Sequence, residues 1–502
     1  MKEYIKSIAT WINTVWQYNL GRIGLILLLA IVALSFIALA VVPSDISIKW
    51  NNPREWAYTP KLAPPDWVAF IGIQRAPHAV INVPRYSTYE EAGITYYVYR
   101  AIYNLDANDY PQNIAVVIEK LNPLVTKSAM DISLKISLTL ERPDNNIVTL
   151  YSGAKQLSEL VSVIQQESEY VLFTDPSTTI SSIRDLVSSI TGMSKIEFSQ
   201  KYEPQLTAGA LYIKYCFSKF SLSGNELRIS PLEGTYRIQF SIAIPTKYLV
   251  ELGLRGSPIE SLSIIVVGDR YGYLGTDYLG RDIALGVLYG FPVGLLIGVF
   301  AATVSVFMGG VLGVVSGYYG GLVDEVIQRF VDVLGNVPLL PIMILIGAIV
   351  QQVFESPWLR LLMIVVVYIA FSWGGTAIIT RTMTLTIKAE PFVEAARALG
   401  AGSARIVFRH ILPNVMPYLF ASLVFAVPGA ILLEAGLSVL GIYHGLPTWG
   451  SILASAEEYR GVAMYAWWWV LPPGMSMALT SFTFIALGIS IETIVDPRLR
   501  GR

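Results

Sequence analysis

The sequence has few charged residues, few histidines and almost no cysteine. Asp, Glu, Lys and Arg make up 15% of the 502 residues, and hydrophobic residues make up 53%; soluble domains are typically about 25% charged. The single cysteine, Cys216, cannot form an internal disulfide, and His78, His410 and His444 are too scattered for a Cys/His metal cluster. The net charge of −1 excludes the basic field that nucleic-acid binding requires. The composition favours a protein embedded in a membrane.

Six uncharged runs are long enough to cross a bilayer, which takes about 20 apolar residues in a helix. The run 283–323 is too long for one span, so we expect a segment at the membrane surface up to Gly290, followed by a span. The six expected spans are residues 23–42, 291–315, 333–354, 361–380, 415–433 and 470–491. Ala38-Leu39-Ala40 is similar to a signal-peptidase site, but the first run exceeds a signal core in length, and we interpret it as a retained anchor. These runs predict an all-α membrane bundle of six transmembrane helices.

Lysine and arginine gather in the first 22 residues, in the loop 381–414 and in the C-terminal tail, whereas residues 434–469 contain Arg460 alone. Because cytoplasmic segments carry the excess of positive charge, we expect both termini and the 381–414 loop to be cytoplasmic in a multi-pass protein of the cell membrane. The expected order is a cytoplasmic N-terminus (1–22), a first transmembrane helix (23–42), an extracytoplasmic domain (43–270) and a five-span membrane domain (271–502).

The extracytoplasmic segment 43–270 shows the alternation of apolar and polar residues that is typical of half-buried strands. The alternating stretches are residues 132–140, 211–217 and 236–244. Residues 143–146 are typical of a turn, so residues 147–151 can return as the hairpin partner of the first stretch. One helix is expected over residues 178–190, with Ser177 as its N-cap. We expect a β-rich (α+β) domain without a catalytic constellation or a metal site.

A polar, basic segment, 390–413, lies between two apolar runs and carries the signals of two short helices. Pro391 suits a first helical position, and Gly400 can end that helix. Ser403 can cap a second helix, and Pro413 can close the segment. Four residues recur at helical spacing on one face of the first helix: Phe392, Ala395, Ala396 and Leu399. A small apolar face on a cytoplasmic loop is a surface for a soluble partner.

This segment also resembles a known loop. Glu394-Ala395-Ala396, Gly400, Ile411 and Pro413 together are similar to the EAA loop of ABC-importer permeases. In that family the loop is a coupling helix that docks into a groove of an ATPase subunit. The resemblance implies the following docking residues: Phe392, Glu394, Ala395, Ala396, Leu399, Gly400 and Pro413.

A second resemblance begins before the second expected span. Its residues are Gly275, Thr276, Asp277, Gly280, Arg281 and Asp282, and they resemble the corresponding segment of dipeptide/oligopeptide-type permeases. The likeness continues through residues 317–321, Trp449-Gly450 and Asp496-Pro497-Arg498, and it points to the C-type subunit of the two permeases that pair in this family. The extracytoplasmic segment departs from the family, because it is much larger than the usual external loop.

The resemblance implies a permease subunit of an ATP-driven importer, which forms half of a translocation pathway. The expected partners are a second permease, two cytosolic ATPases, an extracellular substrate-binding protein and membrane lipids. No Walker motif, Gly-x-x-x-x-Gly-Lys-Ser/Thr, occurs in the sequence. ATP and Mg are therefore expected to be used by the partner ATPases, and this chain is expected to bind no cofactor and to catalyse no reaction. Peptides are the first expectation for the substrate and oligosaccharides the second; nickel complexes, which relatives also carry, stay open.

Two alternatives come from other classes of membrane protein. A receptor with an external ligand-binding domain predicts an internal signalling domain, which the short inner segments do not resemble. A secondary transporter predicts inverted repeats and charged residues deep in the spans, and the spans are nearly free of charge. Glu434, at the outer end of the fifth expected span, is either functional or simply solvated, and Pro428 either lines the pathway or is a tolerated kink. The extracytoplasmic domain would be a docking platform for the binding protein or a shield around the pore mouth.

Overall fold

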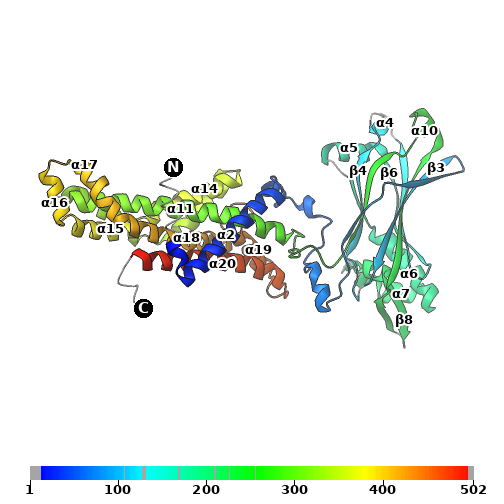
Figure 1. Ribbon diagram of the computed structural model, residues 1–502. Helices are drawn as coiled ribbons and strands as arrows, with labels where there is room; N and C mark the ends of the chain where they lie inside the picture. Colours follow the sequence, from blue (N-terminus) through cyan, green and yellow to red (C-terminus); the bar gives the residue numbers. More distant parts are fainter. Residues whose placement is uncertain are drawn as a thin grey trace. The chain divides into compact units, whose positions relative to one another are not determined.

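The computed structural model describes residues 13–106, 108–126, 132–167, 170–208, 211–224, 226–254 and 256–495. The chain divides into two compact units, a helical unit (Met1–Pro53 with Asp282–Arg502) and a β-rich unit (Arg54–Arg281) (Figure 1). The lysines of the first 12 residues and the expected family residues Asp496-Pro497-Arg498 lie outside the described residues.

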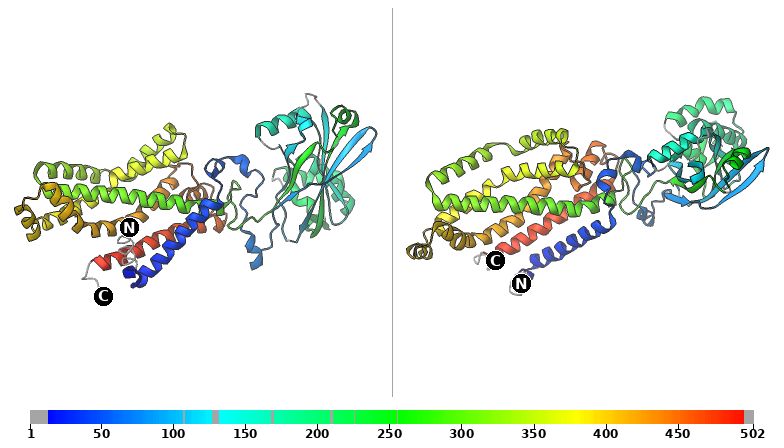
Figure 2. Two further views of the ribbon diagram at one scale, coloured as in Figure 1. Left: turned by 45° about the horizontal axis from the view of Figure 1, so that its top comes forward. Right: turned by 90° about the horizontal axis from the view of Figure 1, so that it is seen from above.

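Long and short helices build the helical unit. They are α2 (Asn19–Val41), α3 (Ile46–Lys49), α11 (Ile283–Tyr319), α12 (Gly321–Asn336), α13 (Leu339–Val353), α14 (Pro357–Ser372), α15 (Gly374–Ile387), α16 (Pro391–Ala398), α17 (Ser403–Ile406), a π-helix (Val407–Ile411), α18 (Leu412–Val439), α19 (Trp449–Glu458) and α20 (Trp467–Val495). Helix α2 lies along α20, and the long α11 packs against α15 and α18 (Figure 2).

Five helical stretches among the described residues are long and apolar enough to cross a membrane. They are Asn19–Val41, Ile283–Tyr319, Pro357–Ile387, Ser403–Val439 and Trp467–Ile494. Helices α12 and α13 pass the same test only as a pair, and they meet at an angle of 82°. The expectation of one continuous helix over residues 333–354 is therefore wrong: Pro338, which has no N–H, stands at the break. The helical unit has five candidate spans, or six if the bent pair is one span.

Residues 283–290, which we expected at the membrane surface, are continuous with the expected span that follows them. They are the first turns of α11, which continues without a break for 37 residues although Pro292 lies within it. Asp282 caps this helix by accepting hydrogen bonds from the backbone N–H groups of Ala284 (2.8 Å) and Leu285 (3.4 Å). At 1.5 Å per residue α11 is about 55 Å long, whereas the hydrocarbon core of a bilayer is about 30 Å thick. One end of α11 must therefore project from the membrane unless the helix is strongly tilted.

Glycines bring α11 close to α15. Gly309, Gly313 and Gly317 recur every four residues along α11, and a Cβ atom at Gly313 would lie 2.0 Å from the hydroxyl oxygen of Thr380. At Gly309 it would lie 2.4 Å from the carbonyl oxygen of Trp373. Because packing drives helix association in lipid, small residues at such crossings are favoured. The glycine-rich composition of this run is thus a requirement of close helix packing.

The β-rich unit contains two antiparallel sheets and a separate hairpin. The four-stranded sheet has the order β1 (Ala79–Asn82), β11 (Ile259–Val267), β4 (Asn113–Leu121) and β7 (Tyr170–Phe173). The five-stranded sheet has the order β2 (Tyr86–Glu91), β3 (Ile94–Leu105), β10 (Gly234–Pro245), β5 (Ser133–Glu141) and β6 (Ile147–Gln156). The separate hairpin consists of β8 (Ser218–Ser223) and β9 (Glu226–Pro231). The helices are η1 (Pro53–Trp56), η2 (Asp66–Ile71), α4 (Pro123–Thr126), α5 (Leu157–Glu167), α6 (Pro176–Thr191), α7 (Lys195–Lys201), α8 (Glu203–Ala208), α9 (Tyr212–Cys216) and α10 (Thr246–Glu251).

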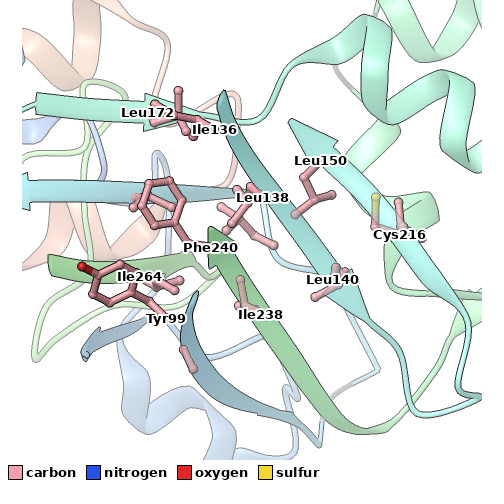
Figure 3. Close-up of a cluster of buried hydrophobic side chains, with 14 of the residues drawn as sticks. Tyr99, Ile136, Leu138, Leu140, Leu150, Leu172, Cys216, Ile238, Phe240 and Ile264 are labelled. Atoms are coloured by element: carbon pink, nitrogen blue, oxygen red, sulfur yellow. The ribbon is translucent and has the colours of Figure 1, made fainter. Parts of the chain in front are cut away.

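One apolar core joins the two sheets (Figure 3). Leu138 of β5 and Phe240 of β10 lie opposite each other in register, and both are completely buried. Ile264 of the four-stranded sheet belongs to the same core. The expected strands over 132–140 and 236–244 are therefore confirmed, as is the hairpin that joins β5 to β6 through the turn 143–146.

Two local expectations in this unit are wrong. Residues 211–217 contain helix α9 and not a strand. The buried side chains Tyr212, Ile213 and Cys216 follow helical spacing. The predicted alternation counted Tyr212 and Cys216 among the polar positions, although both are apolar. The expected helix over 178–190 exists as α6, but Asp175 caps it, with its carboxylate accepting a hydrogen bond from the backbone N–H of Thr178 at 2.8 Å. Ser177 donates its hydroxyl to that same carboxylate.

Candidate functional site

The segment 390–413, which we call the coupling segment after its expected role, begins with the short helix that the sequence predicts. Helix α16 begins with Pro391 in its first turn and ends before Gly400, whose φ of +83° is the left-handed conformation that favours glycine. The N–H of Gly400 donates to the carbonyl of Arg397 (3.0 Å), and the N–H of Ala401 donates to that of Ala396 (3.0 Å). These bonds satisfy carbonyls at the end of the helix and fix its length.

The predicted docking face of α16 is open. Leu399 is 89% exposed and Phe392 43% exposed, with Ala395 also exposed and Ala396 half-buried. Glu394 is exposed too, and no ion pair joins it to another described residue. An apolar face this accessible on an eight-residue helix is unusual unless a partner covers it.

A residue that the sequence analysis did not single out, Val393, anchors the helix. Val393 is completely buried in an apolar cluster with Val314 and Tyr318 of α11 and with Val407 and Leu419. A short helix whose one face is reserved for a partner needs a second apolar contact to hold it in place. The valine beside the predicted face was the only sequence signal for that contact.

Two expectations about the end of this segment are wrong. Ser403 is the first residue of α17, and Gly402 occupies the N-cap position. Pro413 does not close the segment, because the helix runs on through a π-helical turn into α18. In that turn the N–H of Leu412 reaches back five residues to the carbonyl of Val407, and such a wider turn accommodates a proline that cannot donate to the helix.

Polar contacts tie the base of the coupling segment to α11 and α12. Arg381 of α15 donates to both carboxylate oxygens of Asp324, with N–O distances of 2.6 and 2.5 Å. Ser316 also donates to Asp324, and Lys388 donates to the carbonyl of Tyr318 at 2.6 Å. The bidentate geometry makes this a directional link. We expected an orientation from the lysines and arginines of the loop 381–414 but did not predict the pairing of Arg381 with Asp324.

The second motif folds into a hydrogen-bonded turn at one end of the β-rich unit. Thr276, Asp277 and Arg281 are almost completely buried. The carboxylate of Asp277 accepts hydrogen bonds from the side chain of Arg281 (2.5 Å) and from the backbone N–H groups of Leu279 and Arg281 (2.9 Å each). Gly275 and Gly280 both have positive φ. The motif therefore builds a rigid turn, and among the described residues it forms no open binding site.

This turn joins the two ends of the β-rich unit. The hydroxyl of Thr276 donates to the carbonyl of Pro60 (2.6 Å) and accepts from the N–H of Ala63 (3.0 Å). The hydroxyl of Thr59 donates to the carbonyl of Gly280 (2.6 Å), where a Cβ atom would approach Thr59 to 2.6 Å. We call the paired segments 57–66 and 271–281 the stalk. The chain thus enters and leaves this unit at adjacent points.

Glu434 lies in a buried network and is not solvated. Its carboxylate oxygen Oε1 accepts hydrogen bonds from Thr448 (2.8 Å) and Ser438 (3.1 Å) and lies 2.8 Å from Nε2 of His444. The N–H of Leu446 donates to Nδ1 of His444 (3.1 Å), so Nε2 carries the proton and donates to Glu434. The interpretation of Glu434 as a solvated residue is wrong.

The network fastens the loop 440–448 to α18. On the other side of that loop, the side-chain amide of Asn51 donates to the carbonyl of Gly445 (2.6 Å), and the hydroxyl of Tyr443 donates to Asn51 (2.8 Å). Pro428 is buried inside α18, one turn and a half before Glu434. The segment after the first span and the segment after α18 are therefore linked through one loop.

A groove lined with hydroxyl groups lies in the helical unit. It has a volume of about 400 Å³ and lies between α11, α14, α15 and α18. Its polar residues are Ser305, Tyr368, Ser372, Thr376, Tyr418 and Ser422. None of the residues that line it is charged. It borders Trp373, where α14 passes into α15 within the helical stretch Pro357–Ile387.

Comparison with known proteins identifies the helical unit. Residues 309–501 match the family described as the binding-protein-dependent transport system inner membrane component. The oligopeptide transport system permease protein OppC of Haemophilus influenzae is 32% identical over 234 residues, which cover 46% of this chain and 72% of that protein. The chain belongs to this family. The dipeptide transport system permease protein DppC of Bacillus subtilis is 34% identical over 230 residues (45% and 69%), and the peptidoglycan transport system permease protein YejE of Agrobacterium fabrum is 32% identical over 228 residues (45% and 57%).

The family match confirms the resemblance and locates it. It lies within the helical unit and includes α16, the loop 440–448 and most of the groove, whereas the β-rich unit lies outside it. The chain is an integral membrane transport component and not an enzyme. Components of this kind act with further permease, ATPase and substrate-binding subunits.

Proposed function

We propose that this chain is a permease subunit of an ATP-driven peptide importer and forms half of its translocation pathway with a second permease. Relatives named as oligopeptide and dipeptide permeases support peptides as the substrate, and we do not favour oligosaccharides. Two cytosolic ATPases hydrolyse ATP with Mg, and an extracellular binding protein delivers the substrate. In this proposal both termini and the 381–414 loop are cytoplasmic, and the β-rich unit is extracytoplasmic.

The observation that carries this proposal is the exposed face of α16. Phe392, Ala395 and Leu399 present an apolar surface, while Val393 fixes the helix to its own unit. A helix that is anchored on one side and open on the other can transmit a displacement. Docking of an ATPase on the open side would bury the face and leave Glu394 at its rim.

Alternating access follows from this arrangement. Closure of the ATPases on ATP displaces α16, and the Val393 cluster transfers the movement to α11 and α18. The Arg381–Asp324 pair makes α12 and α15 follow. The helical bundle is the two-state element, and the nucleotide state of the ATPases shifts its equilibrium.

In this proposal the hydroxyl-lined groove is this chain's wall of the pathway. Its neutral donors and acceptors can replace water around a peptide main chain without holding a charged side chain tightly. Ser305 and Ser372, whose hydroxyl oxygens are 2.7 Å apart, already satisfy each other. A pathway that binds weakly lets the substrate leave.

The test is site-specific photocrosslinking in the native membrane, followed by purification of the tagged chain and mass spectrometry. A photoreactive residue at Leu399 should capture an ATPase, and the purified complex should contain a second permease and a binding protein. Val250, 75% exposed in the β-rich unit, is the control and should capture no ATPase. Capture of no ATPase at Leu399, with the chain recovered alone, would contradict the importer and favour a receptor or an ion-driven transporter. Competition of uptake by peptides but not by oligosaccharides then tests the substrate.

A further inference from the structure

A group of large apolar side chains stands exposed beside the stalk of the β-rich unit. We call it the aromatic patch; its members are Trp67, Phe70, Ile71, Ile73 and Tyr273. Phe70 is 92% exposed, Tyr273 84% and Ile71 64%. A soluble surface seldom presents so many large apolar groups together, and such patches normally mark an interaction site.

The patch is built on a defined backbone. Helix η2 buries Val68 and turns Trp67, Phe70 and Ile71 outward, and it ends at Gly72, which has a φ of +87°. The N–H of Ile73 then returns to the carbonyl of Val68 at 3.2 Å. The exposure of these side chains is thus a property of an ordered turn and not of a loose loop.

The stalk holds the two parts of the patch together. The indole N–H of Trp67 donates to the carbonyl of Tyr273 (2.9 Å), and the N–H of Asp66 donates to the carbonyl of Gly272 (2.9 Å). Residues from the entering and the leaving segment therefore form one surface. At its edge Asp66 faces the side chain of Arg270, with an N–O distance of 3.9 Å. The patch combines an apolar centre with a charged rim.

The position of the patch in the chain limits its distance from the start of α11. Tyr273 precedes Asp282, the N-cap of α11, by nine residues, and nine residues span at most about 30 Å. Helix α11 starts at once with an uncharged, apolar sequence. Trp, Tyr and Phe are the side chains that collect at membrane–water interfaces, where a ring can lie among lipids while its polar group stays hydrated.

We propose that the aromatic patch lies in the outer surface of the lipid bilayer and holds the β-rich unit against the membrane. The occupant is the headgroup and upper acyl region of lipid, which accepts Phe70 and Ile71 while Asp66 and Arg270 stay among the headgroups. The inference needs only that α11 crosses the membrane, and it is independent of the substrate and of the ATPases. A patch held in the bilayer surface would prevent the β-rich unit from rotating freely about the stalk.

The natural cysteine content makes a direct test possible. Cys216 is completely buried, and burial raises the pKa of its thiol to about 12, so it does not react at neutral pH. The Phe70→Cys variant of the full chain, in lipid nanodiscs, can therefore carry a single environment-sensitive fluorophore. The matched control is Ile196→Cys on α7, which is 71% exposed and outside the patch.

The expected result is a blue-shifted emission at position 70 that is quenched by lipids brominated in their acyl chains and not by aqueous iodide. Position 196 should show the opposite. Equal iodide quenching at the two positions would overturn the proposal. So would a label at position 70 that is open to iodide in nanodiscs and becomes shielded only when a substrate-binding protein is added, because the patch would then be a protein-docking surface.

Discussion

At the scale of single residues, Glu434 shows how a carboxylate is held inside an apolar helical unit. One of its oxygens accepts hydrogen bonds from three donors, and one of these donors, His444, is kept in one tautomer by the N–H of Leu446. A buried acceptor of this kind is stable only while its donors remain. The position of loop 440–448 therefore depends on a few side chains.

We expect His444→Ala to destabilise the helical unit by roughly 1–3 kcal/mol, because it leaves the buried N–H of Leu446 without an acceptor and removes one of the three donors to Oε1 of Glu434. Ser438→Ala removes only the longest of the three bonds, at 3.1 Å, and should cost less. Thermal unfolding of the purified chain, followed by tryptophan fluorescence, measures both. Equal midpoints for the two variants would show that the network does not fasten the loop.

His78 predicts a pH dependence in the β-rich unit. Burial lowers the pKa of its imidazole from 6.5 to about 4, and its buried Nδ1 has no hydrogen-bond partner among the described residues. Between these two pKa values the unfolded chain binds a proton that the folded chain does not. Folding stability should therefore decrease as the pH falls below 6.5, by up to about 1.4 kcal/mol for each pH unit, and stop responding to this group near pH 4.

The measurement is the urea midpoint of the β-rich unit as a function of pH in the wild type and in His78→Phe. Phenylalanine can keep the edge contact with the ring of Tyr271, whose centroid lies 5.2 Å away. The variant should lose most of the slope between about pH 4 and 6.5. Parallel curves for the two proteins would show that His78 is not the responsible group.

At the scale of elements, α16 has a buried side, which holds it to α11 and α18, and an exposed side, which we propose docks an ATPase. We expect Ala395→Trp to abolish ATP-driven uptake while the melting temperature and the basal ATPase activity of the partners remain close to those of the wild type. The bulky ring prevents close approach on the exposed face but disturbs no buried contact. Uptake at the wild-type rate would refute the docking role.

Val393→Ala provides the contrast for that experiment. It opens a gap in the completely buried cluster between α11, α16 and α18 and should lower the melting temperature.

Gly400→Pro should act like Ala395→Trp on uptake, because it removes the N–H that bonds Arg397 and cannot adopt the positive φ.

The stalk is the second element with a measurable contribution. Thr276→Val keeps the shape of the side chain but removes the two side-chain hydrogen bonds to residues 60 and 63, while the bond from the N–H of Thr276 to the carbonyl of Ala63 remains. We expect a local loss of roughly 1–3 kcal/mol, seen as faster hydrogen exchange of the stalk amides by mass spectrometry. The control is Thr207→Val, an exposed threonine on α8. Unchanged exchange in Thr276→Val would mean that other contacts are sufficient to hold the stalk.

The elements also show what the sequence could predict. Strands such as β5 and β10 were found because alternate side chains face one core, and α16 because proline and glycine mark its ends. Helix α9 was not predicted, because its apolar residues fit both the period of a strand and the period of a helix. The role of Val393, the Asp324–Arg381 pair and the union of residues 57–66 with 271–281 could not be predicted, since each depends on contacts between distant parts of the chain.

At the scale of the whole molecule, the two units have separate cores, and the family match covers only one of them. We expect residues 54–281 to fold when expressed alone, because their core is complete and their two ends are bonded to each other. Circular dichroism and a single cooperative unfolding transition would establish this. A broad transition without near-ultraviolet signal would show instead that the helical unit is needed for folding.

The hydrogen bond between Thr59 and Gly280 indicates where the β-rich unit should be deleted, in order to test whether it is a docking platform for the binding protein. A deletion of residues 71–267 would leave the stalk segments without most of the structure between them. Removal between Thr59 and Gly280, whose side chain and carbonyl are 2.6 Å apart, leaves ends that a short turn can close. If that deletion left the affinity for the binding protein unchanged, the platform hypothesis would fail.

The adjacency of residues 59 and 280 has a consequence for how such a chain can arise. A domain whose ends meet can be inserted into a surface loop of an existing protein without moving the elements on either side. The β-rich unit can therefore be gained, lost or exchanged in evolution as a cassette, while the helices that match the transporter family keep their packing. For the same reason, it should be possible to graft this unit into the corresponding loop of a smaller relative.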